Sequence, residues 1–227
     1  MTQRTGQFSF VCSVLFVLAV MTPAAVQADA IDASMKVNYE YTRNVTLANG
    51  EVHATAEFNI ILTSADLGLT NYDTYGYCVE LTQGIGNGTY LVTLDELNND
   101  TYYEIAWLMD SYAPGRGTSL SDTEKNQAAA LQGLIWQNLY GTSYAVTGGA
   151  AITPYYTTYL AALNSLTLTD DLRDYLDSHY MIAAHPTAQN LMIEVNRGNE
   201  VPEPATMLLF GTGLVGLGVL RRRMRRV

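Results

Sequence analysis

The stretch MKVNYEYTRNVTLANGEVHATAEFNIIL, residues 35–62, consists of two alternating segments separated by an Asn-Gly pair at residues 49–50. In the first segment Val37, Tyr39 and Tyr41 alternate with polar residues, and in the second every other residue from Val52 to Ile60 is apolar. A period of two is typical of strands that bury one face, and Asn-Gly is favoured in hairpin turns. The stretch therefore predicts an antiparallel pair of strands.

The rest of the chain continues from this hairpin with strands, then helices, then one strand. Two further strands are expected at 74–81 and 88–94, and the glycine-rich TQGIGNG between them is interpreted as a hairpin turn. Helical spacing predicts helices within 94–115, 119–141, 153–166 and 169–180, and alternation predicts a last strand at 189–195. Ser121 and Glu124 form a capping box for the second helix. This order predicts an α+β fold, an antiparallel β-sheet or barrel with an inserted helical block.

The N-terminus has the pattern of a secretory signal peptide, residues 1–28. Arg4 precedes an apolar run from Phe8 to Val20, and small residues stand at Val26 and Ala28. A basic start, an apolar core and a small-residue cleavage site together predict a signal helix that is removed on export. Cys12 lies in this segment and is expected to leave with it.

The C-terminus, VPEPATMLLFGTGLVGLGVLRRRMRRV at 201–227, places Pro202, Glu203 and Pro204 before an apolar segment and a basic tail. The apolar segment, Ala205 to Leu220, predicts a transmembrane helix. Five arginines follow it: Arg221, Arg222, Arg223, Arg225 and Arg226.

This arrangement resembles the PEP-CTERM sorting signal of Gram-negative bacteria. The resemblance implies export by the secretion machinery, anchoring in the inner membrane through the C-terminal helix, and recognition by an exosortase. It also implies display at the cell surface or in an extracellular, exopolysaccharide-containing matrix. Residues 29–200 then form one extracellular domain.

The acidic composition disfavours one class of partner, and the missing catalytic motifs disfavour conventional catalysis. The chain has 12 Lys and Arg against 22 Asp and Glu, and Arg4 with the five tail arginines accounts for half of the basic residues. The strongly acidic domain that remains disfavours nucleic-acid binding. Its histidines lack metal-ligand spacing and no nucleophile-elbow motif is present, so we expect no enzyme, no metal and no cofactor.

Cys78, in GYCVELTQG at 76–84, is the one cysteine left in the exported domain. Without an internal partner it is an inert buried thiol, an intermolecular bridge or a reactive group. A second motif favours the last of these. LQGLIW at 131–136 places Gln132 on the second helix, four residues before Trp136.

The pair of motifs, YCVEL and Gln-x-x-Ile-Trp, resembles the thioester domains of bacterial surface adhesins. The resemblance implies that the Cys78 sulfur attacks the Gln132 side chain, releases ammonia and forms an internal thioester. Tyr77 and Trp136, each near a reacting residue, would shield that bond from water. The thioester would then react with an amine or another nucleophile on a partner surface.

Two functions are therefore expected from the sequence. The first is a covalent adhesin of the cell surface or extracellular matrix, which attaches through the Cys78–Gln132 thioester to surface amines or matrix polysaccharide. The second is a non-catalytic structural or binding protein of the exopolysaccharide or biofilm matrix, in which Cys78 is a packed thiol.

Overall fold

The computed structural model describes residues 30–116 and 118–196. The predicted signal peptide and the predicted C-terminal transmembrane helix lie outside these residues. Within the described ranges, no helix is long and apolar enough to cross a membrane.

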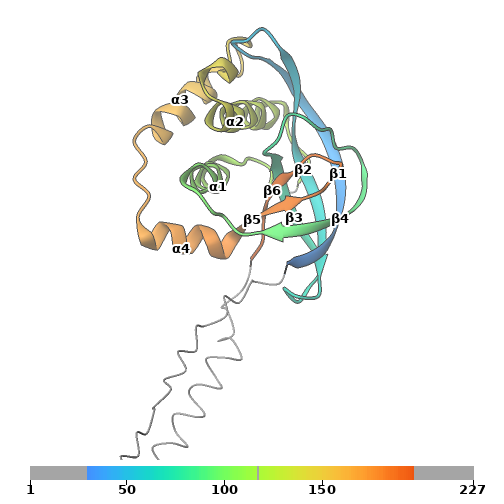
Figure 1. Cartoon of the computed structure of the whole chain (residues 1–227). Helices are drawn as coiled ribbons and strands as arrows, with labels where there is room; N and C mark the ends of the chain where they lie inside the picture. Colours follow the sequence, from blue (N-terminus) through green and yellow to red (C-terminus); the bar gives the residue numbers. More distant parts are fainter. Residues whose placement is uncertain (1–29, 117, 197–227) are drawn as a thin grey trace, which may run out of the picture.

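Six strands close into an antiparallel barrel in the order β1-β2-β3-β6-β5-β4. The strands are β1 (Ile31–Thr46), β2 (Val52–Ser64), β3 (Leu69–Cys78), β4 (Gly88–Asp95), β5 (Tyr180–Ala184) and β6 (Leu191–Glu194). The four helices lie between β4 and β5 in sequence and gather on one side of the barrel (Figure 1). The predicted α+β class with an antiparallel barrel and a helical block is confirmed.

The first hairpin forms as the alternation predicts. Val37 of β1 lies opposite Ile60 of β2, and both side chains are buried in the core. Gly50, in the connecting turn, adopts a φ of 88°, which favours glycine because it has no Cβ. The alternation thus determines which side of each strand faces inward.

The interpretation of TQGIGNG as a hairpin turn is wrong. β3 pairs with β2 and β6, whereas β4 pairs with β1 and β5, so β3 and β4 are not neighbours. The segment between them joins strands that are separated in the barrel by β5 and β6. Closure of the barrel prevails over the local turn signal. Because β3 pairs with β6 and β4 pairs with β5, no strand edge of the sheet stays unpaired.

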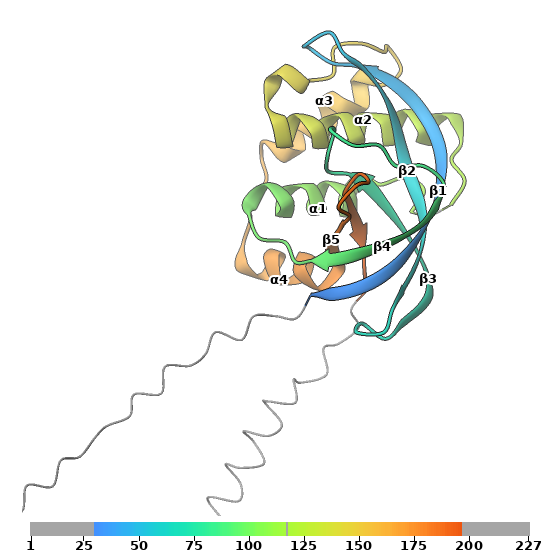
Figure 2. The ribbon, with the colours of Figure 1, turned by 45° about the vertical axis from the view of Figure 1, so that its right-hand side comes forward.

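The helices are α1 (Asp100–Tyr112), α2 (Asp122–Tyr140), α3 (Thr153–Leu163) and α4 (Asp170–His179), with a short 3₁₀ turn at Thr142–Tyr144. All four occur where helical spacing predicts them. β5 was not predicted, because its apolar sequence YMIAA follows α4 directly and has no alternation to separate it from the helix. Figure 2 shows α2 lying along the barrel, and α2 contacts β1, β2 and β3.

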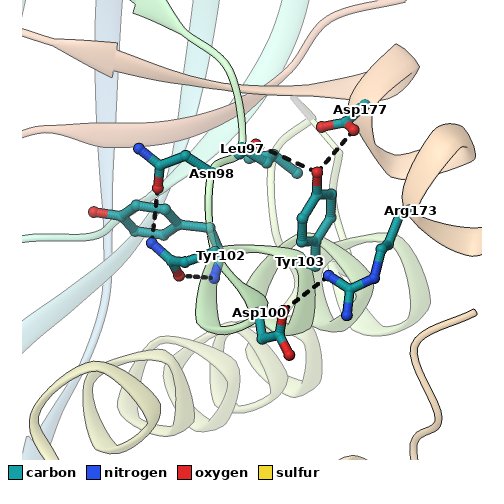
Figure 3. Close-up of polar contacts among 8 residues, drawn as sticks. Leu97, Asn98, Asp100, Tyr102, Tyr103, Arg173 and Asp177 are labelled. Atoms are coloured by element: carbon teal, nitrogen blue, oxygen red, sulfur yellow. Dashed lines mark hydrogen bonds and ion pairs between the residues drawn. The ribbon is translucent and has the colours of Figure 1, made fainter. Parts of the chain in front are cut away.

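Polar contacts fix α4 against α1 at the side of the helical block (Figure 3). The Tyr103 hydroxyl donates to Asp177 Oδ2 at 2.8 Å, and Arg173 Nη1 donates to Asp100 Oδ1 at 2.9 Å. The Arg173 guanidinium also lies 4.9 Å from the centre of the Tyr103 ring. α4 leads directly into β5, so these contacts help to position a strand that completes the barrel.

The predicted capping box of α2 is present. Ser121 accepts a hydrogen bond from the Glu124 N–H at 3.4 Å, and Glu124 Oε2 accepts one from the Ser121 N–H at 2.8 Å. We expect Ser121→Ala to lower the free energy of unfolding by about 1 kcal/mol, because a helix-terminal N–H loses its acceptor. Urea denaturation monitored by circular dichroism would measure this. Exposed Ser119 is the control, since Ser119→Ala leaves the cap intact; equal losses in the two variants would contradict the prediction.

Candidate functional site

Cys78 is the last residue of β3 and lies in the core. It is 5% exposed and pairs with Leu191 of β6. Within the described part of the chain it is a free cysteine. The environment of its backbone and of its side chain is set by two different glutamines.

Gln132, on α2, binds the backbone of Cys78. Its Oε1 accepts from the Cys78 N–H at 2.9 Å, and its Nε2 donates to the Cys78 carbonyl oxygen at 2.9 Å. The Gln132 side chain is fully buried, and this pair of bonds imitates the pairing that another strand would provide. The structure therefore brings Cys78 and Gln132 together across 54 residues, and both hydrogen bonds join the carboxamide to the main chain of Cys78.

Gln189 is the glutamine that meets the sulfur. The Cys78 thiol donates to Gln189 Oε1 at 2.8 Å. Because a C=O bond is about 1.23 Å long, the sulfur lies at most about 4 Å from the Gln189 side-chain carbonyl carbon. Gln189 Nε2 donates to the main-chain oxygen of Glu80, which fixes the orientation of the carboxamide. The sequence does not predict this contact of Cys78 with Gln189.

One sequence signal could have pointed to Gln189. It stands two residues before Leu191 and at the start of the stretch that was predicted to return to the sheet. Only the pairing of that strand with β3, which sets Leu191 opposite Cys78, puts the two side chains together. Strand neighbours of this kind are not encoded in the local period.

Cys78 lines a pocket of about 200 Å³. It opens between the first half of β2, the segment after β3 and the C-terminal half of α2. Cys78, Gln189, Trp136 and His53 all line it, and its other lining residues are Ala54, Ala56, Phe58, Leu81, Gln83, Gly84 and Ile85. A small molecule or an extended side chain that entered this pocket would approach the contact between Cys78 and Gln189.

The two predicted shielding residues lie in different places. Trp136 is almost fully buried and lines the pocket. Tyr77 is fully buried but is not among the lining residues, because successive side chains on a strand point to opposite faces. Its hydroxyl donates to buried Glu57 at 2.7 Å, and burial, followed by the charge of Glu57, raises the pKa of Tyr77. Tyr77 thus keeps its proton and packs β3 against β2.

Burial also controls the state of the thiol. It raises the pKa of Cys78 well above its usual value, and the charge of Glu80 raises it further. At neutral pH the sulfur therefore carries its proton, in agreement with the S–H bond to Gln189. A buried, protonated thiol reacts poorly with reagents in solution, because the thiolate is the nucleophile.

The described residues show no arrangement that suits a metal. Across 30–116 and 118–196, no group of three or more His, Cys, Asp or Glu side chains could hold a metal ion.

Comparison with known proteins identifies the C-terminal segment. Residues 200–225 match the PEP-CTERM protein-sorting motif. No curated protein and no solved structure gives a significant match to the chain. The sorting motif contains the predicted signal residues Pro202, Glu203, Pro204 and Arg221 to Arg223, which lie outside the described residues.

The motif implies a class of protein. Its presence implies export and recognition by an exosortase, with anchoring in the membrane before display at the surface or association with the matrix. The match does not extend to residues 30–196, so the resemblance of the body to thioester domains stays a prediction.

Proposed function

We propose that this protein is a covalent adhesin of the cell surface or matrix, which attaches to its partner through an internal thioester at Cys78. The sorting motif accounts for its delivery to the outside of the cell. The observation that carries the proposal is the contact of the Cys78 thiol with the Gln189 carboxamide at 2.8 Å. The geometry favours Gln189 as the acyl donor, in place of the Gln132 expected from the sequence.

The reaction needs only the two side chains. The Cys78 sulfur attacks the Gln189 side-chain carbonyl carbon, and an S–C bond forms as the C–N bond breaks. The thiol proton leaves with the nitrogen, so the products are a thioester and one ammonia. Holding two reactants in contact replaces about 7 to 11 kcal/mol of the barrier of the intermolecular reaction.

Gln132 suits a positioning role better than an acyl role. Both of its polar atoms are engaged by the Cys78 backbone, so an attack by the sulfur would have to break the bonds that hold β3 to α2. While those bonds stay intact, the Cys78 main chain is fixed and the thiol faces Gln189. Gln132 would thus determine where the nucleophile lies without taking part in bond formation.

The pocket supplies a route for the partner. A nucleophile that enters it attacks the thioester carbonyl carbon, forms a bond to the Gln189 side chain and releases the Cys78 thiol. The indole of Trp136 and the apolar residues around it limit the access of water to the bond. Each molecule would make one covalent attachment, without turnover, which distinguishes this function from that of an enzyme.

Intact-mass spectrometry of the purified chain tests the proposal. We expect the wild-type protein to be lighter by one ammonia than its sequence requires, and methylamine to add to it stoichiometrically. Trypsin separates the candidate glutamines, because cleavage after Arg173 and Arg197 gives a peptide, 174–197, whose only glutamine is Gln189. Gln132 falls in a different peptide, 126–173. The methylamide should appear in the first of these.

Three variants control this experiment. Cys78→Ala and Gln189→Ala should each abolish both the mass deficit and the methylamine adduct. Gln83→Ala is the matched control, because Gln83 is another glutamine that lines the pocket. A methylamide located by fragmentation at Gln132 of peptide 126–173 would restore Gln132 as the acyl donor. A wild-type chain of full mass with an unmodified thiol would overturn the thioester.

A second candidate function is supported by the burial of the thiol. Burial raises the pKa of Cys78, and the S–H group has a hydrogen-bond acceptor, as expected for a packed structural cysteine. In that case the protein is a non-catalytic structural or binding component of the matrix. Cys78→Ala would then leave its association with the matrix unchanged, whereas it abolishes attachment by a covalent adhesin.

A further inference from the structure

His53 lies at the same pocket as the thiol and is held there by two contacts. It belongs to β2 and lines the pocket together with Cys78 and Gln189. Its Nε2 lies 3.1 Å from Glu51 Oε2, and its ring packs edge-on against Trp136, with 5.4 Å between the ring centres. The imidazole is partly exposed, so a molecule entering from solvent can meet it.

The contact with Glu51 determines which ring nitrogen carries the proton. Hydrogen bonds from His53 and then from Asn49 lower the pKa of Glu51, so its side chain is a carboxylate. A carboxylate only accepts hydrogen bonds, and Nε2 must therefore be the donor. In the neutral imidazole the basic lone pair is then on Nδ1, which can take a proton from another group.

We propose that His53 is the proton acceptor for an alcohol nucleophile, and that the thioester is transferred to hydroxyl groups such as those of a polysaccharide. This inference rests on the proposed function. An alcohol is a poor nucleophile until its proton is removed, whereas a free amine attacks a thioester without prior deprotonation. A base in the lining of the pocket therefore matters far more for a hydroxyl partner than for an amine.

The step balances without any further reactant. The hydroxyl oxygen forms a bond to the Gln189 carbonyl carbon as its proton passes to His53, and the C–S bond breaks. The proton then passes from the imidazolium to the departing Cys78 sulfur, which leaves an ester and a free thiol. Burial raises the pKa of that thiol, so the sulfur leaves more readily when a proton is supplied to it.

Two nucleophiles separate this role from a structural one. The wild-type chain and His53→Gln are incubated with glycerol or with methylamine, and the adducts are followed by intact mass. We expect His53→Gln to form the thioester normally and to react with methylamine within about threefold of the wild type. Its rate with glycerol should fall by about 100-fold, the low end of the range for general-base catalysis.

Glu51→Gln and His179→Gln complete the design. Glu51→Gln keeps a hydrogen-bonding group beside His53 but removes the charge, and should slow the glycerol reaction only. His179, at the end of α4, is not among the lining residues of the pocket, so His179→Gln should react like the wild type. Equal loss with both nucleophiles, or no loss with glycerol, in His53→Gln overturns the role of His53. A wild-type chain without the mass deficit overturns the thioester itself, and with it this inference.

Discussion

Gln132→Ala is expected to lower the free energy of unfolding by about 2 to 5 kcal/mol, because two buried main-chain groups of Cys78 lose their partners at once. The Gln132 side chain is fully buried and provides both an acceptor and a donor to that residue. Urea denaturation of the purified chain, followed by tryptophan fluorescence, measures the loss. Trp136 lies on the same helix, one turn from Gln132, and reports on the packing of α2 against the barrel.

Gln127 provides the control for this substitution. It lies on α2 but is only partly buried, so Gln127→Ala should change the stability by about 0.5 kcal/mol or less. Equal stabilities of Gln132→Ala and Gln127→Ala would mean that the two bonds to Cys78 contribute nothing. If Gln132→Ala still loses ammonia and takes up methylamine, Gln132 is a positioning residue and not the acyl donor.

Gly76→Ala is expected to destabilise the barrel by about 3 kcal/mol, at the upper end of the usual cost of overpacking. A Cβ at Gly76 would lie 2.7 Å from the Met192 carbonyl oxygen and 2.9 Å from Ile193 Cγ2, both on the neighbouring strand β6. The carbonyl oxygen belongs to the ladder between β3 and β6, so it cannot move without breaking the pairing. Differential scanning calorimetry of the two proteins measures the effect.

The same substitution should also slow thioester formation. β6 follows Gln189, and a shift of β6 away from β3 would separate that side chain from the Cys78 sulfur. Gly84→Ala is the matched control, since a Cβ there meets no atom within 4 Å although Gly84 also lines the pocket. A Gly76→Ala protein with the wild-type melting temperature would show that β6 accommodates the methyl group.

The local features of the fold were predictable because each has a short-range physical cause. The period of two around residues 49–50 gives the first hairpin, and the capping box at Ser121 starts α2 where expected. The short strand β5 was missed because five consecutive buried or half-buried residues show no alternation. The predicted hairpin between β3 and β4 failed because glycines permit a turn but do not determine which strands pair.

The candidate site divides in the same way. Cys78, Gln132 and Trp136 could be selected from two short motifs. In the structure Gln132 binds the backbone of Cys78, and Cys78 and Trp136 line the same pocket. Gln189 stands at the start of the last predicted strand, but the sequence does not show that this strand pairs with β3 beside Cys78. No local feature of the sequence distinguishes His53. Gln189 reaches the thiol across 111 residues.

By itself, the sequence determined the sorting motif, which implies export, and the local elements of the fold. The motif, the alternation of the first hairpin and the capped helix each depend on contiguous residues. The tertiary structure alone decided which glutamine meets the sulfur and which histidine shares its pocket. The reason is that β3 pairs with β6 only when the barrel closes, and this long-range pairing depends on packing of the whole core, not on any local period.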